Sequence, residues 1–283
     1  MPELPEVETV RRGLEPHLQG RRLVRVEQRR KDLRFAFPER FAERLTGARV
    51  ERLERRAKYL LLALDTGETL ISHLGMTGRF TVEADAVGAF HHAAGGSAKH
   101  DHLVLETDQG CRITYNDARR FGYMDLVPSE GIETCVHFRQ MGPEPLGNSF
   151  HADHLGAALE GRRQPIKTLL LDQRIVAGLG NIYVCEALHR AHISPERAGG
   201  ALTKAELETL VKIVRAVLEE ALIAGGSTLR DFRHSDGELG YFQHAFRAYG
   251  REGEPCLGEA CGGLILRKAQ GGRSSFYCAK CQT

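Results

Sequence analysis

Four cysteines near the C-terminus constrain the fold of this chain more than any other feature. They follow the pattern Cys256-x4-Cys261-x16-Cys278-x2-Cys281, in which two close pairs are separated by a strand-like stretch. Two such pairs on neighbouring turns place four thiolates tetrahedrally, which suits Zn²⁺ in a closed structural site. Fewer than 60 residues follow the last long predicted helix, too few for a good core, so a metal would supply the missing folding free energy. We therefore predict one structural zinc ion, with four unrelated thiols as the weaker alternative.

Composition limits the class of protein. Of the 283 residues, 42% are apolar and 27% are charged, an ordinary globular balance that excludes collagen-like and fully disordered chains. No run approaches the roughly 18 apolar residues that span a bilayer, so no membrane partner is expected. Seven cysteines, an odd number, in a chain without a signal peptide favour a reducing, cytoplasmic location. The cysteines outside the zinc pattern are expected to be small buried hydrophobes, and they are Cys111, Cys135 and Cys185.

The net charge of +2 hides a local asymmetry. Residues 1–60 carry 16 basic and 10 acidic side chains, whereas residues 61–110 carry 2 and 7. A basic surplus recurs in residues 161–200, with 6 basic against 3 acidic side chains. This distribution fits separate phosphate-contacting patches on a neutral body. A solvated charged surface is the alternative, and charge alone favours it.

Residues 1 to about 135 are typical of a sheet-rich domain that a helix opens. Residues 4–18 have apolar side chains at helical spacing, with Pro5 in a first-turn position, and Gly20 ends the run. A second short helix is expected from Pro38 to about Leu45. Short β-type runs at hairpin-like intervals indicate a sandwich or barrel rather than alternating β-α units. The predicted strands are Leu23–Val26, Tyr59–Leu64, Thr69–Leu74, His102–Glu106, Arg112–Tyr115 and Tyr123–Val127.

The pattern becomes helical after the Gly- and Pro-rich residues 141–148, so we place a domain boundary there. The best-defined helix begins at Thr203, which forms a predicted capping box with Glu206. Apolar residues then recur on one face until Gly225 ends the helix. Upstream, a glycine turn precedes a helix that Asn181 is predicted to cap.

Several separated motifs occur in one order along the chain. It begins with PELPEVET and continues with RRAKYLLL around Lys58, SHLGMTG around Met76, RRFG from Arg119 and GLGNIY around Asn181. GGSTLRDF and SDGELGYF follow the long helix, and the four-cysteine region closes with GRSSFYC. Over nearly its whole length the chain resembles the formamidopyrimidine-DNA glycosylases, bacterial repair enzymes that remove oxidised purines.

The resemblance implies an α+β fold with two domains. The N-terminal catalytic domain, residues 1–140, is expected to be a β-sandwich flanked by helices. The C-terminal domain is expected to be helical, with a helix-two-turn-helix part at residues 149–248 and a four-Cys zinc finger at residues 249–283. DNA would lie in a basic cleft between the sheet domain and the helical, zinc-bearing domain.

The resemblance also implies a catalytic group at the N-terminus. Removal of Met1 would leave Pro2 as a secondary amine, and an α-amino pKa of about 7.7–8.0 keeps a useful fraction neutral. Such an amine can attack the sugar C1′ to give a charged iminium. Pro2 is then the nucleophile and Glu3 the general acid/base, while Glu6 handles protons secondarily or positions the terminus. An acidic first turn that complements the helix dipole is the alternative.

Other implied residues hold the phosphates of DNA around a base that has left the duplex. Lys58 and Arg273 are grouped with the catalytic residues. Lys58 would contact phosphate as a point charge, and Arg273 would contact it through its forked guanidinium group. His73, Asn181 and Tyr249 would add DNA-binding contacts, of which Tyr249 is the weakest candidate. Taken singly, Lys58 could be a strand-edge charge and Asn181 a simple helix cap.

A wedge of Met76, Arg119 and Phe121 would fill the vacated stack and face the orphaned base, although a lone Met or Phe is usually a core residue. Residues 225–241 would form a loop that covers the flipped base. The sequence departs from the family pattern at Ala118, where a proline commonly precedes the RRFG motif and tightens its turn. It departs again in the first cysteine pair, which has four intervening residues rather than two, and at residues 84–98, an Ala/Gly/His-rich insertion expected to be a solvated loop.

These features together predict a bifunctional DNA glycosylase and abasic-site lyase. Pro2 would displace an oxidised purine, 8-oxoguanine or a formamidopyrimidine, through a Schiff base and then cleave the strand by β,δ-elimination. The expected partner is double-stranded DNA with oxidised bases, and the expected state is a monomer at the nucleoid in the bacterial cytoplasm. An endonuclease VIII-like enzyme for oxidised pyrimidines and a non-catalytic zinc-finger DNA-binding protein are the alternatives.

Overall fold

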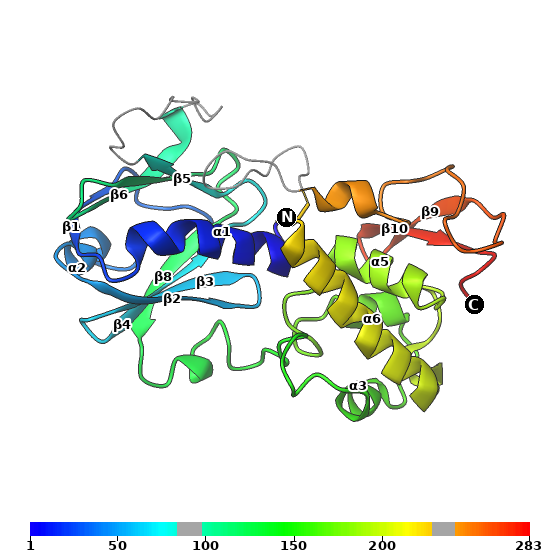
Figure 1. Ribbon diagram of the computed structural model, residues 1–283. Helices are drawn as coiled ribbons and strands as arrows, with labels where there is room; N and C mark the ends of the chain where they lie inside the picture. Colours follow the sequence, from blue (N-terminus) through cyan, green and yellow to red (C-terminus); the bar gives the residue numbers. More distant parts are fainter. Residues whose placement is uncertain (84–97, 228–240) are drawn as a thin grey trace. The chain divides into compact units, whose positions relative to one another are not determined.

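The structure, a computed structural model, describes residues 1–83, 98–227 and 241–283 and divides the chain into two units (Figure 1). The first unit is Met1–Arg139 with Gly225–Tyr241, and the second is Gln140–Ala224 with Phe242–Thr283. The predicted insertion lies outside the described residues except for Ala98, and so does most of the loop predicted over the flipped base. The three predicted domain ranges stay predictions.

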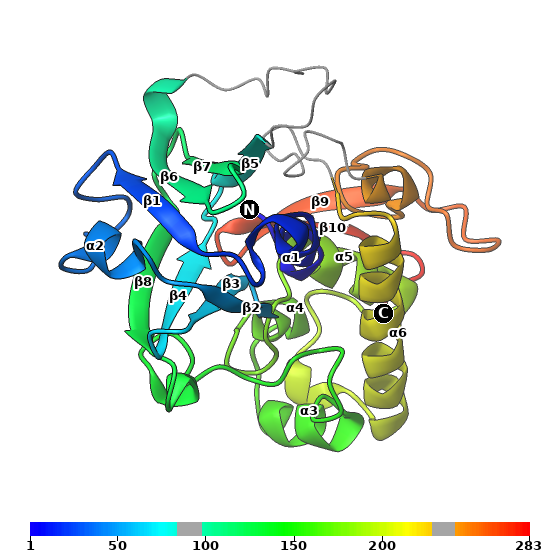
Figure 2. The ribbon, with the colours of Figure 1, turned by 60° about the vertical axis from the view of Figure 1, so that its left-hand side comes forward.

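Two four-stranded sheets build the first unit, which confirms the predicted sandwich (Figure 2). One sheet has the order β1-β6-β7-β5 and the other the order β2-β3-β4-β8. All neighbouring strands within them are antiparallel. The strands are β1 (Leu23–Gln28), β2 (Val50–Arg56), β3 (Tyr59–Leu64), β4 (Glu68–His73), β5 (Arg79–Glu83), β6 (Asp101–Thr107), β7 (Arg112–Asn116) and β8 (Tyr123–Pro128).

The core of the first unit is shared by the two sheets. Leu60, Leu62 and Leu64 of β3 belong to the same buried cluster as Leu103 and Leu105 of β6 in the other sheet. Each fully buried leucine stabilises the fold by about 1.5–3 kcal/mol relative to an exposed one. Because successive side chains of a strand alternate between faces, a one-residue slip would turn this whole set out of the cluster. The cluster therefore fixes the register of both sheets.

Two helices cover edges of the sandwich. Helix α1 (Leu4–Leu18) packs against β2, β3 and β5, and β2 and β5 are edge strands of different sheets (Figure 1). Helix α2 (Phe41–Leu45) packs against β1, the edge strand at the other side of its sheet. Arg44 of α2 donates to the carbonyl oxygen of Leu126 in β8, the corresponding edge of the second sheet. Exposed edges invite pairing with other chains, so these helices protect the sandwich.

The prediction of secondary structure in the first unit is good for the helix and incomplete for the strands. Residues 4–18 form a helix with the predicted bounds, and α2 begins at Phe41 rather than Pro38 because Arg40 adopts a left-handed conformation with φ 53°. Strands β2 and β5 are absent from the prediction. Both are edge strands, and β2 buries only Val50 and Leu53 among charged neighbours, so it lacks a strong apolar signal.

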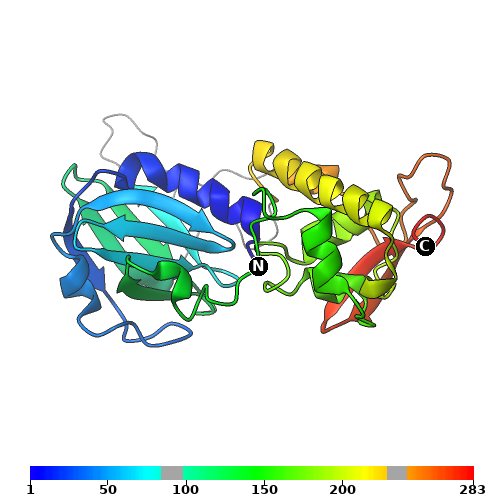
Figure 3. The same cartoon turned by 90° about the horizontal axis from the view of Figure 1, so that it is seen from below.

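The second unit consists of helices and a C-terminal hairpin. The long helix α6 packs against α5 and α3, and Figure 3 shows α6 in yellow beside the green α3. Within the described ranges, no helix has both the length and the apolar character needed to cross a membrane. The elements are α3 (Ala152–Leu159), α4 (Ile166–Leu170), α5 (Asn181–Arg190), α6 (Lys204–Ile223), β9 (Ile265–Gln270) and β10 (Arg273–Cys278). Short 3-10 helices are η1 (Ala98–His100), η2 (Ile132–Thr134), η3 (Gly199–Ala201) and η4 (Phe242–Ala245).

Helix α6 confirms the predicted capping box. The Thr203 hydroxyl accepts from the amide of Glu206 at 3.3 Å, and the Glu206 carboxylate accepts from the amide of Thr203 at 2.7 Å. Such a cap contributes about 1 kcal/mol. After the helix, Gly225 has φ 72°, a left-handed conformation that glycine adopts without strain.

Candidate catalytic and DNA-binding site

The N-terminal turn places the predicted catalytic group in the interior of the first unit. Pro2 is buried, and Glu3 and Glu6 are 3% and 2% exposed, whereas Met1 is 43% exposed. Pro5 stands in the first turn of α1, where its missing amide proton has no intrahelical partner to lose. Glu3 is the N-cap residue of the same helix. One helix start thus brings Pro2, Glu3 and Glu6 together.

The carboxylate of Glu6 is engaged on both oxygens. Oε2 accepts from the backbone amide of Glu3 at 2.9 Å. Oε1 accepts from the backbone amide of Ser227 at 2.8 Å and from its hydroxyl at 2.9 Å. A carboxylate that holds three donors orients the chain around it. Of the two roles predicted for Glu6, this geometry favours positioning of the terminus over proton transfer.

The chemistry of Pro2 depends on its nitrogen. While Met1 is attached, this nitrogen belongs to a planar tertiary amide, and its lone pair is delocalised into the carbonyl group. Once Met1 is removed, the nitrogen is a free secondary amine. Burial favours the neutral form of an amine, whereas a neighbouring carboxylate favours the protonated form. The buried position of Pro2 therefore supports a reactive amine and opposes the effect of Glu3 and Glu6.

Adjacent strands bring Lys58 and His73 to the same end of one sheet. Lys58 lies in the tight turn before β3, where Ala57 has φ 52°, and it is 6% exposed. Tyr59 pairs with His73 across β3 and β4, and His73 pairs with Tyr123 across β4 and β8. The register of the sheet, rather than closeness in sequence, therefore assembles this part of the site.

His73 is held as a neutral hydrogen-bond donor. Burial, with the nearby charges of Lys58, Arg34 and His137, lowers its pKa to about 4. The backbone amide of Gly75 donates to Nδ1 at 3.1 Å, which leaves the ring proton on Nε2. A phosphate at this position would meet an N–H group and no positive charge on the ring.

Two tyrosines fix the ring of His73. Tyr123 stacks on it, with ring centroids 5.2 Å apart and an interplanar angle of 17°, and the Tyr59 ring lies 5.0 Å away. The two tyrosine hydroxyls form a 2.8 Å hydrogen bond with each other. Burial, then this hydrogen bond, raises the pKa of Tyr123. The sequence does not single out either tyrosine, because both read equally well as ordinary strand residues.

Two loops carry the residues of the predicted wedge. Met76 follows β4, and Arg119 and Phe121 precede β8. Met76 and Phe121 are 36% and 43% exposed, and the Arg119 guanidinium carbon lies 4.6 Å from the centroid of the Phe121 ring. A Cβ atom on Gly75 would lie 2.3 Å from the Phe121 carbonyl carbon, so only glycine fits where the loops touch. The structure thus brings the three wedge residues into one exposed group.

In the second unit, Asn181 contacts the backbone beside Arg273. The side-chain nitrogen of Asn181 donates to the carbonyl oxygen of Ser274 at 2.9 Å, and Arg273 is the exposed neighbour of Ser274 at the start of β10. The predicted cap is wrong, because Gly180 is the N-cap residue of α5 and Asn181 is its first helical residue. A contact across 93 positions engages the Asn181 side chain, and no local pattern reveals it.

Lys167 supports the same hairpin from helix α4. Its side chain is fully buried, and Nζ donates to the carbonyl oxygen of Ser274 at 3.0 Å and to the hydroxyl of Ser275 at 2.7 Å. Burial lowers the pKa of Lys167, and the charge of Arg273 lowers it further. Sequence reasoning missed Lys167, since a single lysine in a short apolar helix reads as a solvated residue.

Tyr249 is fixed by a buried carboxylate. Glu186 of α5 is fully buried and accepts from the amides of Arg247, Ala248 and Tyr249 at 2.8 to 2.9 Å. The Tyr249 ring packs edge-on against Phe276 of β10, with centroids 5.0 Å apart. Tyr249 is therefore held against the hairpin that carries Arg273. Glu186 is also absent from the sequence prediction, because nothing local distinguishes a buried glutamate in a helix from an exposed one.

The four C-terminal cysteines form a metal site. Their sulfur atoms all lie within 4.8 Å of one another, with Cys256 3.7 Å from Cys281 and Cys261 3.6 Å from Cys278. A tetrahedral Zn²⁺ with bonds of about 2.3 Å requires sulfur atoms about 3.8 Å apart, whereas a disulfide requires about 2.05 Å. The donor set and its spacing therefore fit one structural zinc ion, as predicted.

A histidine adjoins the zinc site. Nε2 of His189, in α5, lies 3.2 Å from the sulfur of Cys256, and the residue is 2% exposed. Burial is the largest cause that lowers its pKa, to about 4. A neutral ring in this position donates an N–H hydrogen bond to the thiolate of Cys256. The four-residue gap in the first cysteine pair is accommodated by Ala260 in a left-handed conformation with φ 51°.

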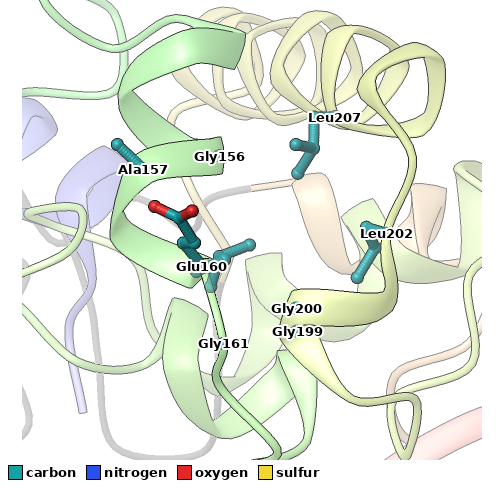
Figure 4. Close-up of a pocket in the computed structure, with 9 residues that line it drawn as sticks. Gly156, Ala157, Glu160, Gly161, Gly199, Gly200, Leu202 and Leu207 are labelled. Atoms are coloured by element: carbon teal, nitrogen blue, oxygen red, sulfur yellow. The ribbon is translucent and has the colours of Figure 1, made fainter.

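The other cysteines and the cavity of the second unit lie apart from these groups. Cys111 and Cys185 are buried as predicted, but Cys135 is only half-buried because it caps the surface turn η2. A cavity of about 310 Å³ is lined by residues of α3, η3 and α6, with Leu202 and Leu207 facing it in Figure 4. None of the predicted site residues lines this cavity, so it is not part of the candidate site.

Comparison with family models divides the chain in three. Residues 1–124 match the formamidopyrimidine-DNA glycosylase N-terminal domain, and residues 141–233 match the H2TH domain of the same family. Residues 253–283 match a zinc finger found in formamidopyrimidine-DNA glycosylase and isoleucyl-tRNA synthetase. The matched ranges follow the same order as the motifs in the sequence.

Individual relatives extend over the full chain. Formamidopyrimidine-DNA glycosylases of Jannaschia sp. and Ruegeria pomeroyi are each 60% identical over 282 residues, with complete coverage of both chains. The solved MutM (Fpg) protein of Thermus thermophilus is 39% identical with a TM-score of 0.86, over 99% of this chain and 98% of that one. A Lactococcus lactis Fpg mutant bound to DNA that contains Fapy-dG is 32% identical with a TM-score of 0.87, over 100% of both chains.

Proposed function

The chain belongs to the formamidopyrimidine-DNA glycosylase family, and on that premise we propose the role of each site residue in the family's reaction. It is a DNA glycosylase of base-excision repair with one structural zinc ion, and lyase activity at the abasic site is typical of the family. The observation that best supports these roles is the buried N-terminal turn, in which Glu3 and Glu6 flank the start of the helix that follows Pro2.

Pro2 is the nucleophile of this proposal. Its lone pair forms a bond to C1′ of the damaged nucleotide, and the electrons of the glycosidic bond leave with the base. The amine then loses its proton while Glu3 donates one to the ring oxygen O4′, so the sugar opens and an iminium forms between the proline nitrogen and C1′. The iminium withdraws electrons, which allows the C2′ proton to be removed and the 3′ phosphate to leave. A second elimination releases the 5′ phosphate.

Glu6 holds the terminus in place during these steps, through its bonds to the Glu3 amide and to Ser227. Lys58 and Arg273 contribute positive charge to the phosphates beside the reacting sugar. His73 and Asn181 contribute N–H donors, which fix the register of the DNA without added charge. Tyr249 is the weakest of these candidates, and its support is the buried Glu186 carboxylate that holds its backbone.

Met76, Arg119 and Phe121 act as the wedge. An apolar or planar side chain between base steps offsets part of the lost stacking when a base leaves the duplex. Met76 and Phe121 are apolar and at least a third exposed, and the Arg119 guanidinium group lies over the Phe121 ring, so the side chains are accessible to a base step, which supports this role.

The substrates of this proposal are oxidised purines, 8-oxoguanine and formamidopyrimidines. A relative bound to Fapy-dG DNA supports that class. A second Lactococcus lactis structure, 32% identical to this chain, holds DNA with an oxidised pyrimidine. For that reason the pyrimidine class characteristic of endonuclease VIII is the second candidate, and activity on both classes must be measured.

Borohydride trapping tests the proposed chemistry. Protein from which Met1 has been removed should give a covalent protein-DNA adduct with an 8-oxoguanine duplex, because borohydride reduces the iminium to a stable amine. Protein that retains Met1, and a Pro2→Gly variant, should give little adduct. Normal trapping with Met1 retained would exclude Pro2, and duplex binding without any trapping would indicate a non-catalytic DNA-binding protein. A panel of purine and pyrimidine lesions then decides the substrate class.

We further propose that the protein acts as a monomer at the bacterial nucleoid, without a membrane partner. Sedimentation with and without a lesion duplex tests the monomer, since a one-to-one complex is expected. A two-to-one complex at saturating protein would contradict it.

A further inference from the structure

The two loops of the wedge meet on the carboxylate of a fully buried residue, Asp117. It directly follows β7 and begins the loop that carries Arg119 and Phe121. A buried carboxylate without hydrogen-bond partners would be costly, and Asp117 has several such partners. These partners belong to both loops and to a neighbouring strand.

Each oxygen of the Asp117 carboxylate accepts two hydrogen bonds. Oδ1 accepts from the Thr77 hydroxyl at 2.5 Å and from the backbone amide of Arg119 at 3.3 Å. Oδ2 accepts from the backbone amide of Gly122 at 2.8 Å and from the Tyr115 hydroxyl at 3.4 Å. Thr77 directly follows Met76 in the sequence, and Phe121 lies between Arg119 and Gly122. One carboxylate thus joins the loops of all three wedge residues.

The Thr77 hydroxyl completes this connection. It donates to Asp117 and also accepts from the amide of Arg119 at 3.2 Å. Threonine therefore acts as a bridge between the two loops, a contact that valine, of similar shape, cannot make. The backbone of Asp117 is held as well, since its carbonyl oxygen lies 2.8 Å from Nε2 of His102.

Close packing restricts the backbone of the loop that carries Arg119 and Phe121. A Cβ atom on Gly122 would lie 1.9 Å from the Tyr115 hydroxyl and 3.1 Å from Oδ2 of Asp117. Arg120 adopts a left-handed conformation with φ 55°, which is strained for a residue other than glycine. Such a conformation persists only where surrounding contacts enforce it, and Asp117 supplies contacts on both sides of Arg120.

We propose that Asp117 is the positioning residue of the wedge, and this rests on the proposed function. Its carboxylate holds the loops of Met76, Arg119 and Phe121 in one arrangement before DNA binds. This lowers the free-energy cost of ordering the three side chains when they insert into the duplex. The residue directly before Arg119 is Ala118, which has no ring that would restrict the backbone there. Four hydrogen bonds to a buried charge supply that restriction in this chain.

The variants Asp117→Asn and Thr77→Val test the proposal. Asparagine has the same shape but turns an NH₂ group toward one pair of donors, whereas valine removes the bridge and leaves the carboxylate in place. The matched control is Asp65→Asn, because the Asp65 carboxylate also accepts from a backbone amide, that of Arg49 at 2.8 Å, on an unrelated hairpin. Thermal melting establishes that each variant is folded.

Three measurements separate positioning from a general structural role. The first is the single-turnover rate of 8-oxoguanine excision from duplexes with cytosine or adenine opposite the lesion. The second is the fluorescence of 2-aminopurine placed beside the lesion, which reports unstacking. The third is borohydride trapping on a single-stranded oligonucleotide with a preformed abasic site, a substrate with no base pair to open.

For Asp117→Asn we expect a loss of about tenfold in duplex excision, which corresponds to about 1.4 kcal/mol in the barrier. The 2-aminopurine signal should fall and the preference between opposite bases should narrow, while single-strand trapping stays within about twofold of the wild type. Thr77→Val should change the same readouts in the same direction by a smaller factor. Asp65→Asn should behave as the wild type does.

An Asp117→Asn variant that is folded and keeps the wild-type fluorescence signal and opposite-base preference would overturn the proposal. Equal losses on duplex and single-stranded substrates would also overturn it, because they indicate damage to the catalytic group. If Asp117→Asn does not fold, Thr77→Val decides by the same criteria. If the wild type itself gives no adduct at an abasic site, the proposed function fails instead.

Discussion

The carboxylate of Glu6 accepts hydrogen bonds from both the backbone amide and the hydroxyl of Ser227, a residue 221 positions further along the chain. Its other oxygen accepts from the amide of Glu3. The start of helix α1 is thus fastened to the segment that follows the long helix α6. Because these bonds use both carboxylate oxygens, they predict a positioning role that can be separated from proton transfer.

Glu6→Gln should lower the single-turnover rate of adduct formation by about tenfold, the effect of about 1.4 kcal/mol. Glutamine has one acceptor oxygen, so its NH₂ group must face the amide of Glu3 or the donors of Ser227. The shape of the pH-rate profile should not change. Glu8→Gln, two residues further along the same helix, serves as the control, since the Glu8 carboxylate forms ion pairs with Arg11 and Arg12 rather than hydrogen bonds to the N-terminal turn. Loss of one limb of the profile in Glu6→Gln would instead identify Glu6 as a proton donor or acceptor.

His73 should make the stability of the protein depend on pH. Its pKa is about 4 in the folded protein and about 6.5 in an unfolded chain, so the unfolded state binds more protons between these values. The free energy of unfolding therefore falls as the pH falls through this window. His73→Gln lacks this contribution, and its stability relative to the wild type should rise by at least about 1 kcal/mol between pH 7 and pH 4.5. Urea denaturation at both pH values measures the free energy of unfolding. The same difference between His73→Gln and the wild type at pH 7 and at pH 4.5 would contradict the prediction.

Arg273 and His73 should differ in how salt affects their contribution to DNA binding. Arg273→Ala should weaken binding to every duplex and reduce the slope of log Kobs against log salt concentration by about 0.9, because one phosphate contact by a cation is lost. His73→Ala should weaken binding with no change in slope, since its ring is neutral at pH 7. Fluorescence anisotropy at several salt concentrations gives both slopes. An equal reduction in the two variants would show that His73 binds phosphate as a cation.

His189 should slow the loss of zinc. Its N–H group donates to the Cys256 sulfur, and removal of a hydrogen-bond partner of a metal ligand commonly changes metal affinity by about 10–100-fold. His189→Phe keeps a buried ring but removes the donor, so transfer of zinc to a chromophoric chelator should be about tenfold faster. His17→Phe in the first unit is the control. Equal transfer rates in the wild type and His189→Phe would exclude a role for this bond.

Local patterns in the sequence were sufficient where the signal itself is local. The bounds of helix α1, the capping box of Thr203 and Glu206 and the four-cysteine site are all encoded by side chains at short spacing, and the structure confirms each. The resemblance of the motifs to a family added Pro2, Glu3 and the phosphate contacts, whose roles stay predictions. Strand β2 was missed because its outer face is charged and only two of its residues are buried.

The residues that hold the site in place could not be predicted in this way. Asp117, Lys167 and Glu186 are charged side chains that become buried only through contacts with other parts of the chain. Nothing in the neighbouring sequence distinguishes them from solvated residues. The same limit explains the wrong cap at Asn181, whose side chain bonds to the backbone of a distant hairpin. Burial of a charge is a property of the tertiary fold.

The carbonyl oxygen of Ser274 has a consequence for thermodynamic linkage. It accepts from both Asn181 and Lys167, so the hairpin that ends in zinc ligand Cys278 and the helices beside it share one hydrogen-bonded junction. If Asn181 and Arg273 bind phosphate as proposed, zinc and DNA stabilise the same arrangement of this junction. Thermodynamic reciprocity then requires that a bound lesion duplex raises the affinity of the protein for zinc by the same factor by which bound zinc raises its affinity for the duplex.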